Sequence, residues 1–172
     1  MLAAFNAAGW TYRIDFDYIS ELSKQLNMSC IGATNYSQKT IHLSDASATL
    51  HEFGHFLDWT LGIPAEHEQL YLAEAQNSGL RDYAKTNARE YFADCFDYWI
   101  AYSGSEKRMD METFRNAAPQ TWAYFEALEK NNWSGWHLKP PPSGSTLDRG
   151  GSFLVQFCAS RSCRRSAMQI LS

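Results

Sequence analysis

The 172-residue chain lacks any run of 18 or more apolar residues, so it predicts no helix that could span a membrane. Its first residues include neither a basic segment nor a long apolar run, and no signal peptide is recognised. The cysteines also lack Cys-x-x-Cys spacing, which argues against a structural zinc knot built from thiolates. Their spacing leaves the disulfide state open for Cys30, Cys95, Cys158 and Cys163.

The chain has no overall excess of basic residues, because its formal net charge is −4. The basic residues gather late: residues 134–172 carry five Lys or Arg against one Asp, a net charge of +4, so residues 1–133 carry −8. An acidic body of this kind argues against a nucleic-acid partner. It is compatible with a basic peptide substrate, although an ordinary solvated surface explains it equally well.

The composition predicts one packed domain and a tail of a different character. Hydrophobic residues make up 45% of the chain and aromatic residues 15%, which favours a well-packed core over disorder. From Pro140 the sequence reads Pro-Pro-Pro-Ser-Gly-Ser, as in a linker. We therefore expect a domain over residues 1–138 and a poorly ordered basic tail over 139–172, in which only Phe153–Phe157 has the character of a short strand.

The most informative motif is His-Glu-Phe-Gly-His at residues 51–55, which has the pattern H-E-x-x-H. Two histidines four residues apart lie on one face of a helix, so both imidazoles can reach one zinc ion. Glu52 is offset from them, and its carboxylate can reach a water on the metal. The pattern predicts that His51 and His55 bind zinc and that Glu52 is the general base.

The residues around the motif predict that it lies on a single helix. Ser44, Asp45 and Ser47 can cap the start of an apolar run, and Gly62 with Pro64 can end it. We expect a helix over about residues 46–61. The alternative is a core helix that carries two unrelated histidines.

A zinc enzyme of this kind needs a third protein ligand, and Glu90 is the favoured residue. It lies in a second helix expected over residues 87–101, and Asp94 follows four residues later on the same face. Asp94 is then placed to accept the other ring N–H of a ligand histidine. Glu74 is the rival ligand, but it has no acidic partner four residues later.

Asp58 shares a helix face with the two histidines but does not qualify as a ligand. It is about 10 Å along the axis from His51 on a straight helix, too far to share one ion. We expect a hydrogen-bond or salt-bridge role for it. The metzincin class is excluded, because Leu61 stands where that class requires a histidine.

These two segments resemble the catalytic domain of anthrax lethal factor and are similar to the bacterial Pro-Pro endopeptidases. The resemblance rests on His-Glu-Phe-Gly-His-Phe-Leu-Asp at residues 51–58 and on the stretch from Tyr83 to Asp94. It implies that Glu90 is the third zinc ligand and that Tyr83 stabilises the oxyanion. Tyr83 alone could as easily be a half-exposed packing tyrosine. Asp94 departs from the family, which commonly has Glu there.

The resemblance also implies a fold: α+β and mostly helical, zincin-like, with a short edge strand before the zinc helix. Residues 39–43 alternate and are β-branched, so they predict that strand, and an edge strand could pair with an extended substrate. His42 lies on it and reads as an ordinary strand residue. Residues 32–35 read as a turn, and further helices are expected over residues 15–28, 66–77 and 119–130.

The sequence thus predicts a zinc metalloendopeptidase of the gluzincin type, with one catalytic Zn²⁺, a peptide or protein substrate and a monomeric state. The resemblance favours secretion, although no signal peptide is visible. Two alternatives remain open. One is a non-catalytic, zinc-stabilised module that binds a protein partner, and the other is an aromatic-rich helical interaction protein without a metal. Substrate sequence preference lies in loops that the sequence does not place.

Overall fold

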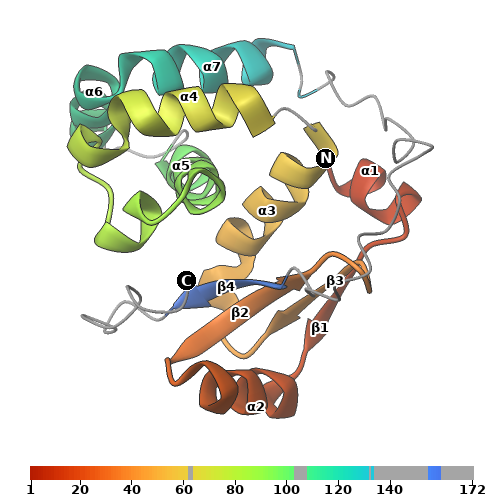
Figure 1. Cartoon of the computed structure of the whole chain (residues 1–172). Coiled ribbons are helices and arrows are strands. Elements are labelled where there is room, and N and C mark those ends of the chain that lie inside the picture. The colour runs from red at the N-terminus through yellow and green to blue at the C-terminus, as the bar shows by residue number, and fades with distance from the viewer. Residues whose placement is uncertain (62–63, 103–107, 132, 134–154, 160–172) are drawn as a thin grey trace.

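The computed structural model describes residues 1–61, 64–102, 108–131, 133 and 155–159. It is an α+β protein in which helices predominate, as expected from the sequence. A small sheet lies at one end and a layer of helices at the other, and helix α3 (Thr49–Leu61) runs between them (Figure 1). The described part of the chain contains no helix long and apolar enough to cross a membrane.

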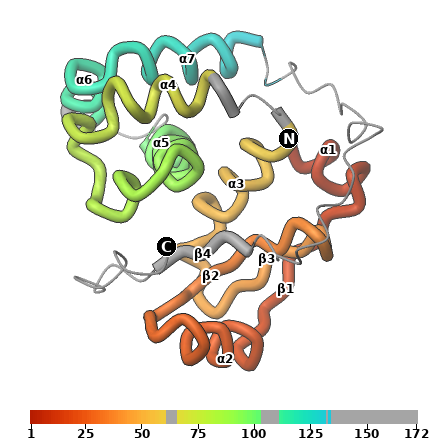
Figure 2. The backbone as a smooth tube through the Cα atoms, viewed as in Figure 1, coloured from red at the N-terminus to blue at the C-terminus, as the bar shows by residue number. Residues whose placement is uncertain are grey.

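The sheet has the strand order β1-β3-β2-β4. Strand β1 (Thr11–Ile14) pairs in parallel with β3 (Thr40–Leu43), and β3 pairs antiparallel with β2 (Cys30–Asn35). Strand β4 (Val155–Ala159) comes from far along the chain and pairs antiparallel with the other edge of β2. The tube view shows β1, β2 and β3 at one end of the molecule, with α2 beside them (Figure 2).

Helix α2 (Phe16–Leu26) covers the sheet face opposite to α3. Asp15 caps it by accepting a hydrogen bond from the Tyr18 amide at 3.1 Å, as an N-cap carboxylate should. His42 points to this face, where its ring stacks on Tyr18 at a centroid distance of 3.8 Å. The sequence interpretation of His42 as an ordinary strand residue, directed away from Ile41 and Leu43, is confirmed.

Helix α3 follows β3 through one 3-10 turn (Ala46–Ala48), which Asp45 caps by accepting from the Ser47 amide at 2.8 Å. One side of α3 packs on β2 and the other on α5 (Ala88–Tyr102). Because both sides are covered, its core residues Phe56 and Leu57 are fully buried. The expected helix over residues 46–61 is therefore confirmed, with its first turn in 3-10 form.

The remaining helices cover α5 (Figure 1). Helix α4 (Pro64–Glu74) and α7 (Pro119–Lys130) pack on α5, and α6 (Arg108–Ala117) packs on both α5 and α7. Two 3-10 turns, η2 (Ala75–Asn77) and η3 (Asp82–Lys85), connect α4 to α5. The short helix α1 (Leu2–Ala7) inserts Phe5 into the same core.

Two strand predictions are wrong. Residues 32–35 are not a turn but the last four residues of β2. Strand β3 is not an edge strand, because β1 and β2 take up both of its sides. The sequence analysis did not recognise β1, whose parallel pairing with β3 moves the strand before α3 to the interior of the sheet. Strand β2 lies between β3 and β4, so β4 forms the sheet edge on that side.

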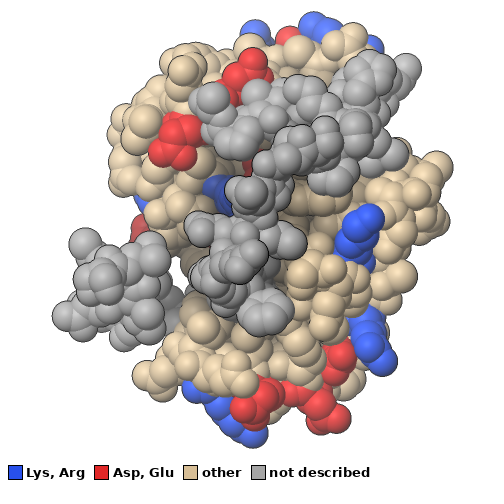
Figure 3. Space-filling view, turned by 45° about the vertical axis from the view of Figure 1, so that its right-hand side comes forward, with Lys and Arg blue, Asp and Glu red and all other residues tan. Residues whose placement is uncertain are grey.

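The segment after residue 138 contributes one described element. A strand was expected at Phe153–Phe157, and the structure has β4 at Val155–Ala159, displaced by two residues. The rest of the proposed tail, 139–154 and 160–172, lies outside the described residues, and the boundary at residue 138 stays a prediction. On the described surface of the face in Figure 3, acidic and basic side chains are interspersed.

Candidate metal centre

The two histidines of the motif lie on one face of α3, as their spacing predicts. Their rings meet at 87° with centroids 4.7 Å apart, and the two Nε2 atoms are 3.1 Å from each other. Both side chains are buried. The helix therefore presents two imidazole nitrogens to a single point.

A carboxylate from α5 completes this group. Glu90 Oε2 lies 3.0 Å from His51 Nε2 and 3.5 Å from His55 Nε2. Burial alone would raise the pKa of the Glu90 carboxyl, but the facing rings of His55 and His51 outweigh it and hold that pKa below its ordinary range. Among the described residues, these three form the group that could hold a metal ion.

The two helices meet unusually closely at this point. A Cβ atom added to Gly54 would lie 2.7 Å from the Ala93 Cα and 3.0 Å from the Ala93 carbonyl oxygen. Both are backbone atoms, so no side-chain rotation could make room. Gly54, in the middle of the histidine motif, therefore lets α3 approach α5 until Glu90 reaches the imidazoles.

Asp94, one turn after Glu90, holds the first histidine. Its Oδ1 lies 2.5 Å from His51 Nδ1. A carboxylate can only accept, so Nδ1 carries the proton and the Nε2 lone pair faces the ligand group. The predicted contact between Asp94 and one of the two motif histidines is confirmed. Burial would raise the pKa of Asp94, but hydrogen bonds from Arg81 and His51 lower it.

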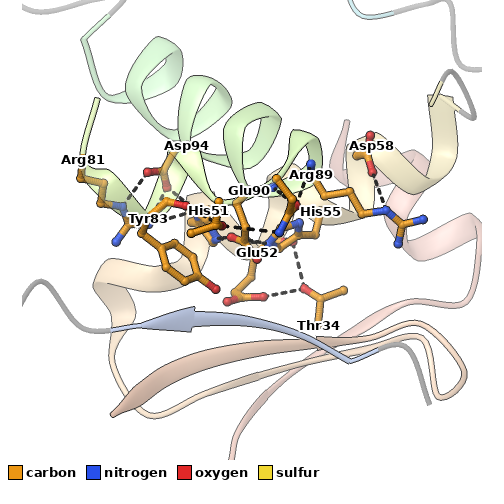
Figure 4. Close-up of polar contacts among 12 residues, drawn as sticks. Thr34, His51, Glu52, His55, Asp58, Arg81, Tyr83, Arg89, Glu90 and Asp94 are labelled. Atoms are coloured by element: carbon orange, nitrogen blue, oxygen red, sulfur yellow. Dashed lines mark hydrogen bonds and ion pairs between the residues drawn. The ribbon is translucent and has the colours of Figure 1, made fainter. Parts of the chain in front are cut away.

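Glu52 projects from α3 toward β2 rather than toward α5 (Figure 4). The Thr34 hydroxyl donates to its Oε2 at 2.7 Å. Its Oε1 is buried and has no hydrogen-bond partner among the described residues. Burial raises the pKa of Glu52, and the charges of His55 and His51 and the bond from Thr34 oppose that rise.

Gly32 makes the room that this carboxylate occupies. A Cβ atom at Gly32 would lie 2.8 Å from Glu52 Oε1 and 2.9 Å from Glu52 Cγ. The residue that the sequence analysis interpreted as part of a turn thus sits in a strand, where its missing side chain accommodates the proposed base.

Tyr83 lies on η3, beside the ligand group. Its ring centroid is 6.1 Å from that of His51, and its hydroxyl points to the side on which the Glu52 carboxylate lies (Figure 4). The ring is half-buried. The structure therefore brings all five residues singled out from the sequence to one place: His51, Glu52, His55, Tyr83 and Glu90.

The two remaining acidic residues have structural contacts. Asp58 contacts His67 Nδ1 and lies 3.8 Å from Arg89 Nε, which confirms the expected hydrogen-bond or salt-bridge role. Glu74, the rival ligand, caps the start of α7 by accepting from the Gln120 and Thr121 amides, each at 2.8 Å. The rival interpretation is wrong, because both Glu74 oxygens are directed to that helix.

The three ligand atoms fit zinc. Tetrahedral zinc with bonds of 2.0–2.1 Å needs ligand atoms about 3.3 Å apart, and the three separations are 3.0, 3.1 and 3.5 Å. With Nδ1 of His51 protonated, its Nε2 offers a lone pair next to a carboxylate and a second imidazole. A cation held between them would remove the repulsion among these electron-rich atoms.

Together these observations define a class: a mostly helical α+β protein with a buried His-His-Glu group able to hold one metal ion. The chain belongs to the anthrax toxin lethal factor family. The family described as "Anthrax toxin lethal factor, N- and C-terminal domain" matches residues 15–128, which is more than half of the chain. No curated protein sequence matches the chain.

Three residues of the site were not predicted from the sequence: Thr34, Gly32 and Arg81. Thr34 and Gly32 contact Glu52, and Arg81 pairs with Asp94 through two hydrogen bonds. None belongs to the two matching segments that carried the family resemblance. A strand prediction for residues 30–35 would have placed Gly32 and Thr34 on one face, which is the signal that could have found them.

Proposed function

We propose that this protein is a zinc-dependent endopeptidase of the gluzincin type with a zincin-like fold. His51, His55 and Glu90 would hold the metal. The observation that carries the proposal is that three nitrogen and oxygen atoms from two helices converge at zinc-ligand spacing. Membership of the lethal factor family supports it.

Zinc at this position would polarise the scissile carbonyl and make a bound water more acidic. The protein's own groups do the rest. Asp94 fixes the tautomer of His51, so that Nε2 and not Nδ1 faces the metal. Thr34 holds one oxygen of Glu52, and Oε1 is left to accept the proton of the attacking water and pass it to the leaving amine. The Tyr83 hydroxyl would donate to the oxyanion.

The substrate would be an extended peptide that pairs with β2 along the side that β4 occupies in this structure, and it would take the place of β4. Strand β2 carries Gly32 and Thr34 against Glu52, so a peptide on its edge passes beside the proposed base. Strand β4 supports the idea, because it shows that this edge accepts an extended segment in antiparallel register, from Cys30↔Ala159 to Asn35↔Val155. Main-chain pairing of this kind is a common mode of peptide recognition.

The test combines zinc content with peptide cleavage. Zinc-loaded protein is incubated with a proteome-derived peptide library, alongside Glu52→Gln and His51→Ala. We expect the parent to cleave peptides, Glu52→Gln to keep one zinc per chain with at least about a hundredfold loss of cleavage, and His51→Ala to lose both.

Three outcomes would contradict the proposal. Cleavage by Glu52→Gln at the parental rate would exclude Glu52 as the base. One zinc per chain with no cleavage of any library peptide would instead support the non-catalytic, zinc-stabilised module. Protein purified without chelator or nickel resin that contains far less than one zinc per chain would favour a protein without a metal.

A further inference from the structure

Arg81 forms a two-pronged contact with Asp94. Its Nε donates to Oδ2 at 2.6 Å, and its Nη2 donates to Oδ1 at 2.5 Å. The same Oδ1 accepts the proton of His51 Nδ1 at 2.5 Å. Arg81 Nη2 lies 3.2 Å from His51 Nδ1. Both nitrogens carry protons and cannot bond to each other, so each donates to the Asp94 oxygen. The Arg81 guanidinium thus holds the Asp94 carboxylate, which in turn orients the His51 ring.

The same guanidinium also contacts Tyr83. Its Cζ lies 5.2 Å from the centre of the Tyr83 ring, within the range of a cation–π interaction. The Tyr83 ring in turn lies 6.1 Å from the His51 ring. Arg81, Asp94, His51 and Tyr83 therefore form a closed set of contacts, drawn from η3, α5 and α3 (Figure 4).

The position of Arg81 in the chain explains how one residue serves both contacts. It is the residue before η3, two positions ahead of Tyr83. Its side chain ties the start of this turn to α5, while the Tyr71 hydroxyl ties the far end by donating to the Lys85 carbonyl at 2.8 Å. Without the contact between Arg81 and Asp94, the start of the turn that carries Tyr83 loses its side-chain hydrogen bonds to the helix that carries Glu90.

We propose that Arg81 is a positioning residue that couples the metal ligand His51 to the oxyanion residue Tyr83. One arm acts through Asp94 on the orientation of the His51 ring, and the other sets the place of the Tyr83 ring. This inference rests on the proposed zinc site. Asp94 is buried, so without Arg81 its charge would lose its cationic partner and keep only the hydrogen bond from His51. A lysine could not replace both prongs, because its ammonium lacks the planar fork.

The first arm is tested by zinc affinity, measured by competition with a chromophoric chelator. Arg81→Met should bind zinc about 10–100-fold more weakly than the parent, and Asp94→Asn should lose a similar amount. The double variant should lose no more than either single variant, because both act through the same contact. The double variant also removes the buried Asp94 charge, so it stays informative if Arg81→Met folds poorly. Zinc affinity within about twofold of the parent in Arg81→Met, or additive losses, would overturn this arm.

The second arm is tested with Tyr83→Phe in two backgrounds. In the parent, losing the hydroxyl should lower kcat by about 10–1000-fold. In Arg81→Met the same change should cost less than about threefold, because Tyr83 is already displaced. KM should change little in either case. An equal kcat cost of Tyr83→Phe in both backgrounds would overturn this arm.

Two measurements separate this proposal from the proposed activity. If the parent cleaves no peptide, the endopeptidase proposal fails, but zinc affinities still decide the first arm. The ring NMR signals of Tyr83, assigned with Tyr83→Phe, then decide the second: zinc should shift them in the parent and not in Arg81→Met. Equal shifts in both would contradict the proposal. Arg115→Met is the matched control, because Arg115 lies over the Trp122 ring at 5.7 Å, away from the site.

Discussion

At the residue scale, Glu52 shows how the site depends on contacts that no local pattern reveals. The spacing of the motif on α3 predicts that His51 and His55 share a face, and the register of α5 predicts that Glu90 and Asp94 share another. Both predictions hold because helix geometry alone decides them. Thr34 is 18 positions away from Glu52 in the sequence, so only the folded sheet brings them together.

The hydroxyl of Thr34 gives a prediction at this scale. Thr34→Val keeps the shape but leaves Glu52 Oε2 without its donor, which should destabilise the fold by about 1–3 kcal/mol. The freed carboxylate should also lower kcat by on the order of tenfold or more, with zinc content unchanged. Thr34→Ser keeps the hydroxyl and is the control. Peptide kinetics and urea unfolding check both, and equal kcat for Val and parent would contradict the role given to Thr34.

At the scale of elements, five helices were predictable (α2, α3, α4, α5 and α7), whereas α1, α6 and most of the sheet were not. The apolar periodicity of α2, α3, α5 and α7 reflects burial of one face along several turns. Strand β2 contains Gly32, which favours a turn when read locally. The structure shows why it is there: a side chain would collide with Glu52. The need for space beside Glu52 therefore explains why β2 contains a glycine, a residue that strands otherwise disfavour.

The contact between α3 and α5 gives a second prediction. Gly54→Ala should favour an isolated helix by about 1 kcal/mol, but here the new Cβ meets the Ala93 backbone at 2.7 Å. We expect a net destabilisation of about 1–3 kcal/mol, as for other overpacked cores. Zinc affinity should also fall, because the ligands come from both helices. Urea unfolding in EDTA and chelator competition measure the two effects, and a more stable variant with parental zinc affinity would contradict this account of the packing.

At the scale of the whole molecule, the sheet beside the proposed metal site is formed by strands β2 and β4, which lie far apart in the chain. Sequence analysis placed the substrate-pairing edge on β3, because a strand immediately before the zinc helix was the local evidence. The parallel pairing of β1 with β3 overturns that, since it encloses β3 between two neighbours. Long-range strand order depends on tertiary packing, and no pattern in residues 39–43 encodes it.

The pairing of β4 with β2 gives a third prediction. The double variant Gln156→Pro/Phe157→Pro places two prolines next to each other in β4. The amides of neighbouring strand residues point to opposite sides, so one of the two prolines always removes an N–H that bonds to β2. Amides of Cys30–Asn35 should then exchange faster with deuterium. KM for peptides should fall by on the order of tenfold, because no tethered segment competes for the edge.

Gln156→Ala/Phe157→Ala is the matched control, because it keeps both amides. Unchanged exchange in Cys30–Asn35 together with an unchanged KM in the proline variant would show that β4 does not compete with substrate for this edge.

The central claim, zinc bound by two imidazoles and one carboxylate, is tested most directly by X-ray absorption at the zinc edge. The spectrum is recorded on protein carrying one zinc per chain, with Glu90→Ala beside it. We predict imidazole scattering from two histidines and four nitrogen or oxygen neighbours at about 2.0–2.1 Å, with the carboxylate contribution lost in Glu90→Ala. A spectrum with no imidazole scattering, or one identical in the two proteins, would contradict the account.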